Sequence, residues 1–572
     1  MRTVLLLLLL FCCVLIAGNL LYGQSSNTEK SKSLVQLNNF RQLFIDDYLI
    51  EDITNLERVQ HQAIKLPDPI IVPDQQWEKI VYVYGTVLKE EDIYRMYYRA
   101  SDSTGRKFIC FAESVDGVEW TKPFLGVFNY NGSLNNNIII EGVEISSIVV
   151  DLEDIPERRY KMYGYYNLSH SYVYLASPDG ISSWEIITHH MYGGDVCQMN
   201  YDPYQKKFVV IYKIPEEYPY LNYRKFWLAT SPDLISYSPG VLLENQVDSI
   251  DLLYAQEAFR VDPYGMSIFP YEGTYIGFNW IFYIVNVGFG GGTHIGPIDV
   301  HLAFNRELNG IWHRPFRYPI LPRGNDGDWD DGMVFTASYP TIMDDEIWMY
   351  YGGFNEMHGM LEKQGKIGIV RWRLDGFVSL ENKPEDEEGV FVSKELIFEG
   401  SRLRLNADAS NEDAYIYAEL CRPDGTVIPG FSREESNIIN SNSIRHTVSW
   451  ENGDDLSALE GDTIVLKLFI KNSNLYSLSF INIESPTETN KVAGFVSENV
   501  KFYPNPAKDV LYISSKEKID KILVFSIDGK EILSANPRSE LHNLNISELK
   551  AGLYLLQIQS KNSFFSGKFN KF

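Results

Sequence analysis

The sequence predicts an all-β protein with several domains, and three observations support this prediction. A pair of strands followed by a polar turn recurs through the first 380 residues. Aromatic residues make up 14% of the 572 residues, and Tyr and Trp favour strands. No amphipathic helix pattern separates the repeats. We therefore expect a β-propeller followed by smaller β domains.

The N-terminus has the pattern of a secretory signal peptide. Arg2 precedes an apolar run from Val4 to Ala17, and a stretch of small residues ends near Gly23. This predicts a signal peptide over residues 1–23. No later segment contains a run of roughly 18 apolar residues, so we expect no transmembrane segment in the mature chain.

Charge and cysteine content narrow the classes of partner. The formal net charge of -25 argues against nucleic acid, because binding to phosphates needs clustered Lys and Arg. Cys110, Cys197 and Cys421 follow the signal peptide, and their spacing suits neither a zinc site nor a dense disulfide framework. We expect no required cofactor and no metal site of His and Cys, although a channel rich in acids could hold Ca²⁺ weakly.

The repeat predicts a five-bladed propeller over residues 38–380. Each copy has a strand rich in aromatic residues, a second strand, and a turn that usually carries Asp-Gly and then Trp. The first strands begin at Tyr94, Tyr160, Phe208, Tyr275 and Ile347, and the second strands at Phe108, Tyr172, Phe226, Asp299 and Ile367. The alternative is an irregular run of β-hairpins in a sandwich.

A short motif near the N-terminus carries a family resemblance. The segment Leu43–Ile50, which reads LFIDDYLI, resembles the opening of secreted bacterial proteins similar to glycoside hydrolase families 32 and 43. The resemblance covers residues 40–380 and implies a five-bladed propeller with a base or nucleophile, an orienting carboxylate and a Glu acid. The chain lacks the Asn-Asp-Pro opening and the Arg-Asp-Pro triplet of those families, so their residue roles do not transfer directly.

Candidate catalytic residues lie where the innermost strands of the blades begin, because these ends open into a shared funnel. Glycoside hydrolysis needs one protonated and one ionised carboxyl group. We predict Asp195 and Glu257 as this pair, with Glu257 as the acid because apolar neighbours raise the pKa of a carboxyl group. Asp331 and Glu78 are further funnel candidates.

Asp46 has two possible roles. An N-terminal strand that completes the last blade would close the ring, and Asp46 and Asp47 would then fix the seam. We favour this structural role and keep Asp46 as a catalytic candidate.

Aromatic and His side chains near the same strand ends are candidates for substrate binding. Trp77, Tyr254, Trp280 and Trp329 offer rings that stack on sugars. The Gly-rich segment that begins at Gly288 is expected to form a loop over the funnel. His294, at the end of that loop, and His358 are the His candidates.

The last third of the chain predicts two more β domains. An acidic segment near residue 386 marks a boundary, after which residues 388–484 have the strand pattern of a β-sandwich that braces the propeller or binds glycan. A polar linker follows at 485–499. Residues 500–572 then carry Pro504-Asn505-Pro506, Asp528-Gly529-Lys530 and Gly552-Leu553-Tyr554.

These motifs resemble, in order, the C-terminal sorting domain of the type IX secretion system of Bacteroidetes. The resemblance implies a small β-sandwich, the type IX machinery as a partner, and export to the cell surface or medium.

Together these features predict a secreted glycoside hydrolase acting on a polysaccharide or its oligosaccharides. The alternative is a non-catalytic propeller that binds glycan. A polysaccharide lyase is a third possibility, but lyases usually need a basic subsite for uronates, and the sequence shows no concentration of Arg or Lys near the candidate site.

Overall fold

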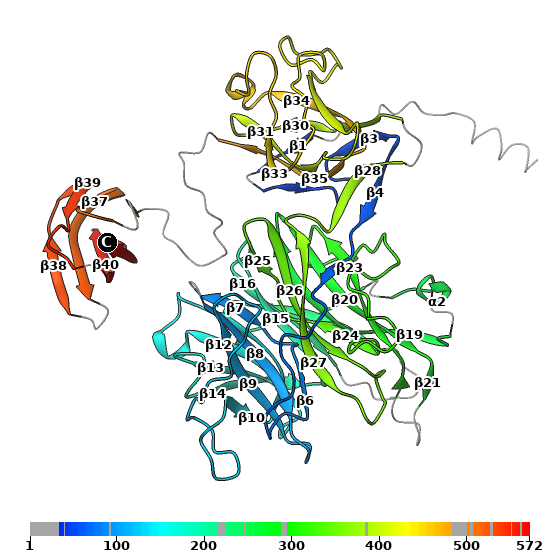
Figure 1. Ribbon diagram of the computed structural model, residues 1–572, viewed down its shortest axis with the longest axis vertical. Helices are drawn as coiled ribbons and strands as arrows, with labels where there is room; N and C mark the ends of the chain where they lie inside the picture. The colour runs from blue at the N-terminus through cyan, green and yellow to red at the C-terminus, as the bar shows by residue number, and fades with distance from the viewer. Residues whose placement is uncertain are drawn as a thin grey trace, which may run out of the picture. The chain divides into compact units, whose positions relative to one another are not determined.

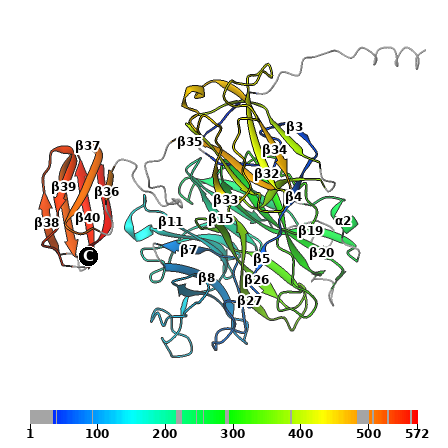
Figure 2. The ribbon, with the colours of Figure 1, turned by 45° about the horizontal axis from the view of Figure 1, so that its top comes forward.

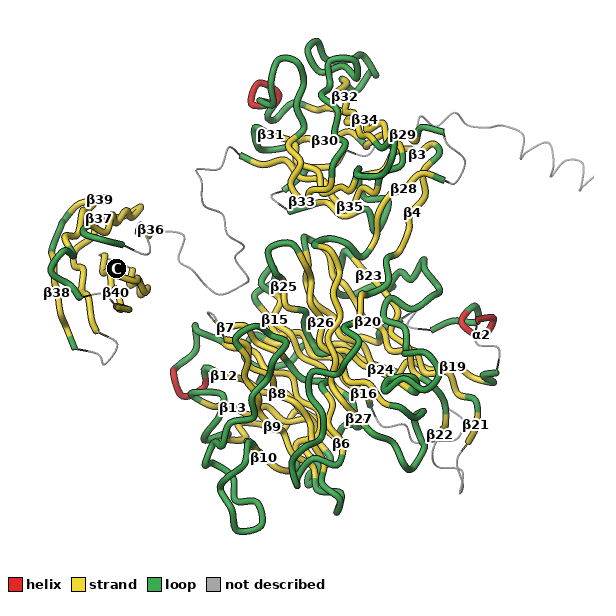
Figure 3. The backbone as a smooth tube through the Cα atoms, in the orientation of Figure 1, coloured by secondary structure: helices red, strands yellow, loops and turns green. Residues whose placement is uncertain are grey.

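A computed structural model of the protein divides into two compact units, residues 1–490 and 491–572. It describes residues 34–38, 40–90, 93–214, 224–244, 247–254, 257–287, 294–383, 387–482, 500–503, 507–526, 530–550, 552–560 and 563–571. The predicted signal peptide, the linker and the segment 288–293 lie outside these residues. The described chain is almost entirely strand and loop, so the all-β prediction is confirmed (Figure 3).

Three separate antiparallel sheets form the first part of the first unit (Figure 1). The first contains β6 (Ile80–Tyr82), β7 (Val87–Glu90), β8 (Ile93–Ser101), β9 (Lys107–Ser114) and β10 (Ile138–Glu141). The second contains β11 (Val143–Val150), β12 (Tyr160–Tyr166), β13 (Ser171–Ser177) and β14 (Glu185–Tyr192). The third contains β15 (Cys197–Asp202), β16 (Lys207–Lys213), β17 (Phe226–Ser231) and β18 (Val241–Leu242).

The fourth sheet consists of two meanders joined by one parallel pair, Ile298 with Met333. Its strands are β19 (Arg260–Tyr271), β20 (Thr274–Ile284), β23 (Ile298–Asn305), β24 (Met333–Thr336), β25 (Thr341–Ile342), β26 (Glu346–Phe354), β27 (Gly365–Arg373) and β5 (Ile64–Lys65). Strand β11 packs beside β15, β15 beside β19, and β27 beside β6. The sheets therefore follow one another around a common centre, which is the propeller arrangement (Figure 2). All ten strands predicted from the repeat are present.

An N-terminal strand closes the last sheet, as the sequence predicts, but different residues fix the seam. Strand β5 pairs with β27 through Lys65 and Val370. The Lys65 Nζ atom lies 2.6 Å from Asp330 Oδ2, and the Tyr351 hydroxyl donates to the same oxygen at 2.8 Å. Asp46 and Asp47 lie outside this seam, because their segment belongs to the sandwich described below.

The repeated turn explains why Tyr replaces Trp in the third copy. The Gly117 N–H donates to the Ser114 hydroxyl at 2.8 Å, and the Trp120 indole N–H donates to the Gly117 carbonyl at 3.1 Å. In the third copy the Tyr237 hydroxyl donates to the Leu234 carbonyl at 2.8 Å. In these two copies the side chain reaches back three residues with a hydrogen-bond donor, so a Tyr hydroxyl can make the contact that an indole makes. In the second copy the Trp184 indole N–H has no partner among the described residues, so the turn does not depend on this bond.

The Gly180 turn yields a stability prediction. Gly180 has φ +75°, and an added Cβ would contact the Tyr97 hydroxyl and lie 2.7 Å from the Tyr160 ring. Gly105 has a similar φ of +89° with no atom within 4 Å of such a Cβ. We expect Gly105→Ala to cost about 1 kcal/mol from backbone strain. We expect Gly180→Ala to cost about 2–4 kcal/mol in total, because overpacking adds to the strain. Urea unfolding measures both, and equal losses would contradict the packing argument.

The β-sandwich takes strands from both sides of the propeller sequence. One sheet contains β1 (Leu34–Gln36), β30 (Glu395–Ile397), β34 (Thr463–Lys471), β29 (Gly389–Ser393), β3 (Ile50–Thr54) and β32 (Tyr415–Cys421). The other contains β33 (Asn442–Thr447), β31 (Arg402–Asp408), β35 (Asn474–Ile481), β28 (Val378–Asn382), β4 (Leu56–Gln60) and β2 (Gln42–Leu43). Residues 38–60, which lie within the predicted propeller range, therefore belong to the sandwich. Phe44, Leu49 and Leu56 are buried in its core with Leu403, which accounts for this placement.

The second unit is a small β domain with its own core. Its strands are β36 (Val500–Tyr503), β37 (Val510–Ser526), β38 (Glu531–Ala535), β39 (Ser539–Asn545), β40 (Gly552–Ser560) and β41 (Ser563–Lys571). Strand β37 pairs with β36 and β39 over its first half and with β38 and β40 over its second. Leu511, Ile522 and Leu556 are buried in its core. In the described chain, no helix has the length and apolar character needed to cross a membrane.

Candidate functional site

Asp195 is an ionised carboxylate that solvent reaches. It lies just before β15, with 55% of its side-chain surface exposed, and the Lys213 Nζ atom lies 2.6 Å from its Oδ1. The surrounding side chains by themselves would raise its pKa, but the charge and hydrogen bond of Lys213, together with the charge of Arg224, outweigh this and lower the pKa to about 2. The group is therefore negatively charged at neutral pH.

Tyrosines from two other sheets lie close enough to this carboxylate to feel its charge. Tyr82 lies on β6, Tyr84 follows that strand, and Tyr264 lies on β19. Burial raises the pKa of Tyr264 to about 12, and the nearby charge of Asp195 adds to this effect. The pKa values of Tyr82 and Tyr84 are raised by the same two causes. The Tyr84 ring centroid lies 4.9 Å from that of Tyr82.

Arg224 and His358 complete the group. The Arg224 Cζ atom lies 4.8 Å from the Tyr264 ring centroid and 5.2 Å from that of Phe282. The His358 ring packs against the same two rings, at 5.2 and 4.9 Å. We refer to Tyr82, Tyr84, Asp195, Lys213, Arg224, Tyr264 and His358 as the axial cluster.

His358 is neutral at pH 7 with a defined tautomer. Its Nδ1 lies 2.8 Å from the His294 carbonyl oxygen, and because a carbonyl only accepts, Nδ1 carries the proton. Burial lowers the His358 pKa to about 4, partly offset by that hydrogen bond and reinforced by the charges of Arg224 and Lys363. Its Nε2 is therefore a hydrogen-bond acceptor beside the axial cluster.

This shift in the His358 pKa predicts how stability depends on pH. The unfolded chain protonates His358 below about pH 6.5, whereas the folded chain does so only near pH 4. The unfolded state binds more protons in this window, so the free energy of unfolding falls as the pH is lowered from 6.5 to 4. His358→Gln should make this fall less steep, as measured by urea unfolding at several pH values. An identical pH dependence in the variant would contradict the low pKa.

The predicted catalytic residues have different settings. Asp195 belongs to the axial cluster, whereas Glu257 lies just before β19 and is exposed, so the expected apolar setting is wrong. The Glu78 side chain is 0% exposed, and it binds Lys122 at 2.6 Å and the Tyr98 hydroxyl at 2.6 Å. Glu78 thus forms an ion pair with Lys122 in the protein interior. Asp331 accepts the Gly327 N–H at 2.7 Å, which is a turn contact.

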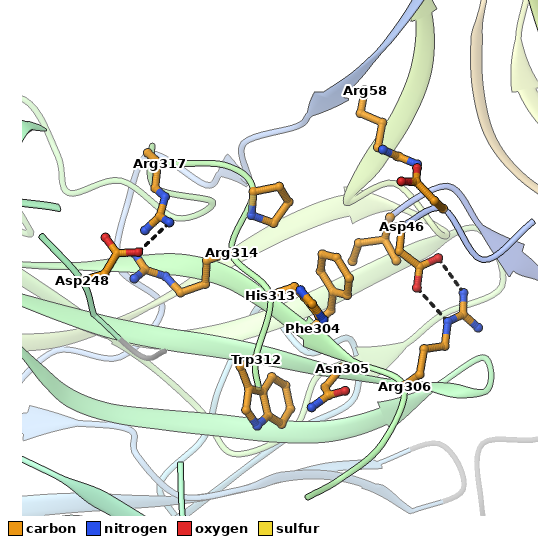
Figure 4. Close-up of a pocket in the computed structure, with 13 residues that line it drawn as sticks. Asp46, Arg58, Asp248, Phe304, Asn305, Arg306, Trp312, His313, Arg314 and Arg317 are labelled. Carbon is orange, nitrogen blue, oxygen red and sulfur yellow. Dashed lines mark hydrogen bonds and ion pairs between the residues drawn. The ribbon is translucent and has the colours of Figure 1, made fainter. Parts of the chain in front are cut away.

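Asp46 lies at a separate cavity of about 540 Å³ (Figure 4). It accepts two hydrogen bonds from Arg306, at 2.8 and 3.0 Å. Across the cavity Arg317 pairs with Asp248 at 2.8 Å. Ile45, Asp47, Arg58, Phe304, Asn305, Trp312, His313, Arg314 and Pro315 complete the lining. No axial-cluster residue lines this cavity. The Asp46–Arg306 ion pair joins the N-terminal segment to the loop that follows β23.

The predicted sugar-stacking residues are mostly packing residues. Trp280 is fully buried and stacks on Tyr84 at 5.1 Å, so it supports the axial cluster from behind. Trp77 is buried, and its indole donates to Asn137 at 2.8 Å. Trp329 is half-buried and stacks on Tyr351 at 5.5 Å. The side chain of Tyr254 lies outside the described residues. His294 is half-buried and supplies its carbonyl to His358.

The fold gathers basic residues in and around the axial cluster that no sequence motif indicates. Arg224, Arg99 and Lys363 come from three different segments, which corrects the expectation that Arg and Lys are not concentrated here. The Arg99 Cζ atom lies 4.9 Å from the Tyr82 ring centroid. Burial and the charge of Arg99 lower the Lys363 pKa, so these two cations lie near each other. Their sequence separation leaves no local signal of this grouping.

Among the described residues, the cysteines and the possible metal ligands do not come together in a metal site. Cys110, Cys197 and Cys421 are all buried. Within the described ranges, no group of three or more His, Cys, Asp and Glu side chains is arranged to hold a metal ion. A weak Ca²⁺ site in the propeller stays a prediction.

Comparison with known proteins identifies the C-terminal unit. Residues 501–571 match the family described as "Secretion system C-terminal sorting domain". The chain carries a type IX secretion sorting domain. This domain directs the protein to the cell surface or the extracellular space through the type IX machinery. No curated protein matches the chain.

Solved structures similar to the chain include carbohydrate-active enzymes. An N-acetylgalactosamine deacetylase from F. plautii is 14% identical, covers 57% of this chain and 97% of its own, and has a TM-score of 0.36. A thermostable family-43 glycoside hydrolase is 15% identical, covering 54% and 96% with a TM-score of 0.37. A family 43 arabinoxylan arabinofuranohydrolase from Bacillus subtilis is 12% identical, covering 72% and 99% with a TM-score of 0.33.

Proposed function

We propose that the protein is a secreted glycoside hydrolase whose axial cluster is the active site of a five-bladed propeller. The five blades are the first three sheets and the two meanders of the fourth. The observation that carries the proposal is Asp195, an ionised and solvent-accessible carboxylate held among tyrosines from the first and fourth sheets. A carboxylate of this kind, beside rings that pack on sugar C–H faces, is what glycosidic cleavage requires.

Asp195 takes the role of base or nucleophile. With a pKa of about 2 it stays deprotonated through the pH range of a working enzyme, so it attacks the sugar or activates water. Lys213 orients the carboxylate through its 2.6 Å hydrogen bond. The Tyr82 and Tyr264 hydroxyls stay protonated and donate hydrogen bonds to sugar oxygens.

Glu257 is the proposed acid. It lies three residues before β19, the strand that carries Tyr264, and it forms no ion pair with a described residue. Glu144 is a weaker candidate, because it binds Lys107 and lies 3.7 Å from Arg99. An acid catalyst must give up a proton to the leaving oxygen, whereas the Glu144 carboxyl group is already engaged by these two cations.

A non-catalytic glycan-binding propeller is the second candidate. The observation that favours it is that Asp195, Glu144 and Asp262 each bind a cation, Asp262 through Arg260 at 2.8 Å. In a binding protein these carboxylates would only hold the cluster together.

Product release tests the two candidates. The chain beginning at residue 24 is incubated with plant and algal polysaccharides and aryl glycosides, alongside Glu257→Gln. Product from the parent chain supports a hydrolase, and its loss in the variant supports Glu257 as the acid. Glycan binding without product would establish the binding protein instead.

A further inference from the structure

Three carboxylates near the axial cluster each already have a cation. Asp195 binds Lys213, Asp262 binds Arg260, and Glu144 binds Lys107. Arg224 and Lys363 are then left without an ion pair among the described residues. The surroundings of the cluster are therefore locally cationic, in a chain whose net charge is -25.

Arg224 is arranged to receive an anion. Its guanidinium lies over the Tyr264 and Phe282 rings, which restricts its orientation, and a hydrogen bond with Tyr264 uses only part of its donors. The Nη1 atom is buried and has no hydrogen-bond partner in the described chain. A buried donor without a partner is costly, and a bound oxyanion would supply the missing acceptor.

The charge of Lys363 acts in the same region as Arg224. Its charge acts on His358, which packs against the same two rings as Arg224. Arg99 lies close enough to Lys363 to disfavour its charged form. Cations brought together in this way repel one another, and an anion bound between them relieves that repulsion.

We propose that Arg224 and Lys363 bind an acidic group, a carboxylate or a sulfate, on a sugar residue of the glycan. This deepens the proposed function, because it takes the axial cluster as the glycan site and names the substrate as an acidic polysaccharide. The planar guanidinium edge suits a carboxylate in two-point contact, and the ammonium supplies a point charge. His358 is neutral, so it accepts a sugar hydroxyl without repelling or attracting the acid.

Binding measurements on the chain beginning at residue 24 test this proposal independently of turnover. Isothermal titration compares oligogalacturonate with its methyl ester, and sulfated galactan oligosaccharides with their desulfated forms, at low and high salt. We expect at least about 10-fold tighter binding of one acidic form, weakened by salt because charges screen each other. Tighter binding of oligogalacturonate than of its methyl ester identifies the acidic group as a uronate. Tighter binding of the sulfated galactan than of its desulfated form identifies it as a sulfate ester.

The variants assign the effect to residues. Arg224→Gln and Lys363→Gln should each abolish most of the preference for the acidic form. Arg371→Gln is the matched control, because Arg371 lies on β27 and pairs with Glu346. Equal binding of acidic and neutral forms, binding of neither, or an unchanged preference in both variants would overturn the proposal. A preference for the acidic form without release of product would support the acidic-group site and contradict the proposed hydrolase activity.

Discussion

Asp195→Asn should lower the rate of glycan cleavage by about 10²–10⁴-fold, the usual contribution of one positioned acid or base. Asn keeps the shape of the side chain and a hydrogen-bond acceptor for Lys213, but it neither attacks a sugar nor takes a proton from water. Because the carboxylate is 55% exposed, the fold should tolerate the change. The measurement is initial rate on the glycan that releases most product, with circular dichroism to confirm folding.

Asp233→Asn is the control for this prediction. Asp233 accepts the N–H groups of Ile235 and Ser236 at 2.9 and 2.7 Å in an exposed turn of the third sheet. It touches no axial-cluster residue in the described chain, so its rate should equal that of the parent. A parental rate in Asp195→Asn would exclude Asp195 from the chemistry, whatever the control does.

Lys65→Met should destabilise the propeller by about 3–5 kcal/mol, the cost of leaving a buried charge without its partner. The side chain of Asp330 is 4% exposed, and in the variant only the Tyr351 hydroxyl would remain to bind it. Because β5 closes the last sheet, the loss falls on the seam of the ring. Chemical unfolding followed by tryptophan fluorescence measures the effect.

Two further variants separate lost charge from lost packing. Adding Asp330→Asn to Lys65→Met should restore part of the stability, since the buried charge is then removed. Lys89→Met should change stability by less than about 0.5 kcal/mol, because surface substitutions away from such features have small effects. A loss below about 1 kcal/mol in Lys65→Met would show that the pair does not hold the seam.

The strands of the propeller were predictable because their signals are local. Alternating aromatic residues recur in each copy, and in the first three copies a Ser hydroxyl accepts the N–H three residues later, as at Gly117, Gly180 and Leu234. The prediction that site residues lie just before the innermost strands selected Asp195, which the structure places just before β15. Its catalytic role stays a prediction. The same rule failed for Glu78, because its partner Lys122 is 44 residues away and nothing near Glu78 in the chain announces it.

Long-range pairing also explains the misplaced N-terminal strands. Lys394 donates to the Asp47 carbonyl across 347 residues. The short strands between residues 34 and 60 have ordinary strand composition, so their sequence cannot say which sheet they join. Likewise, nothing near Arg224 in the sequence shows that the fold places it over the Tyr264 and Phe282 rings.

The sandwich that contains both β1–β4 and β28–β35 has a consequence for the order of assembly. The propeller is inserted in it, and the two crossing points touch, with the His61 N–H 3.0 Å from the Phe377 carbonyl. During synthesis, which starts at the N-terminus, strands β1 to β4 have no pairing partners until residues 378–481 have been made. The sandwich is thus completed only after the whole propeller has been made. A chain released before that point would expose four unpaired strands to aggregation.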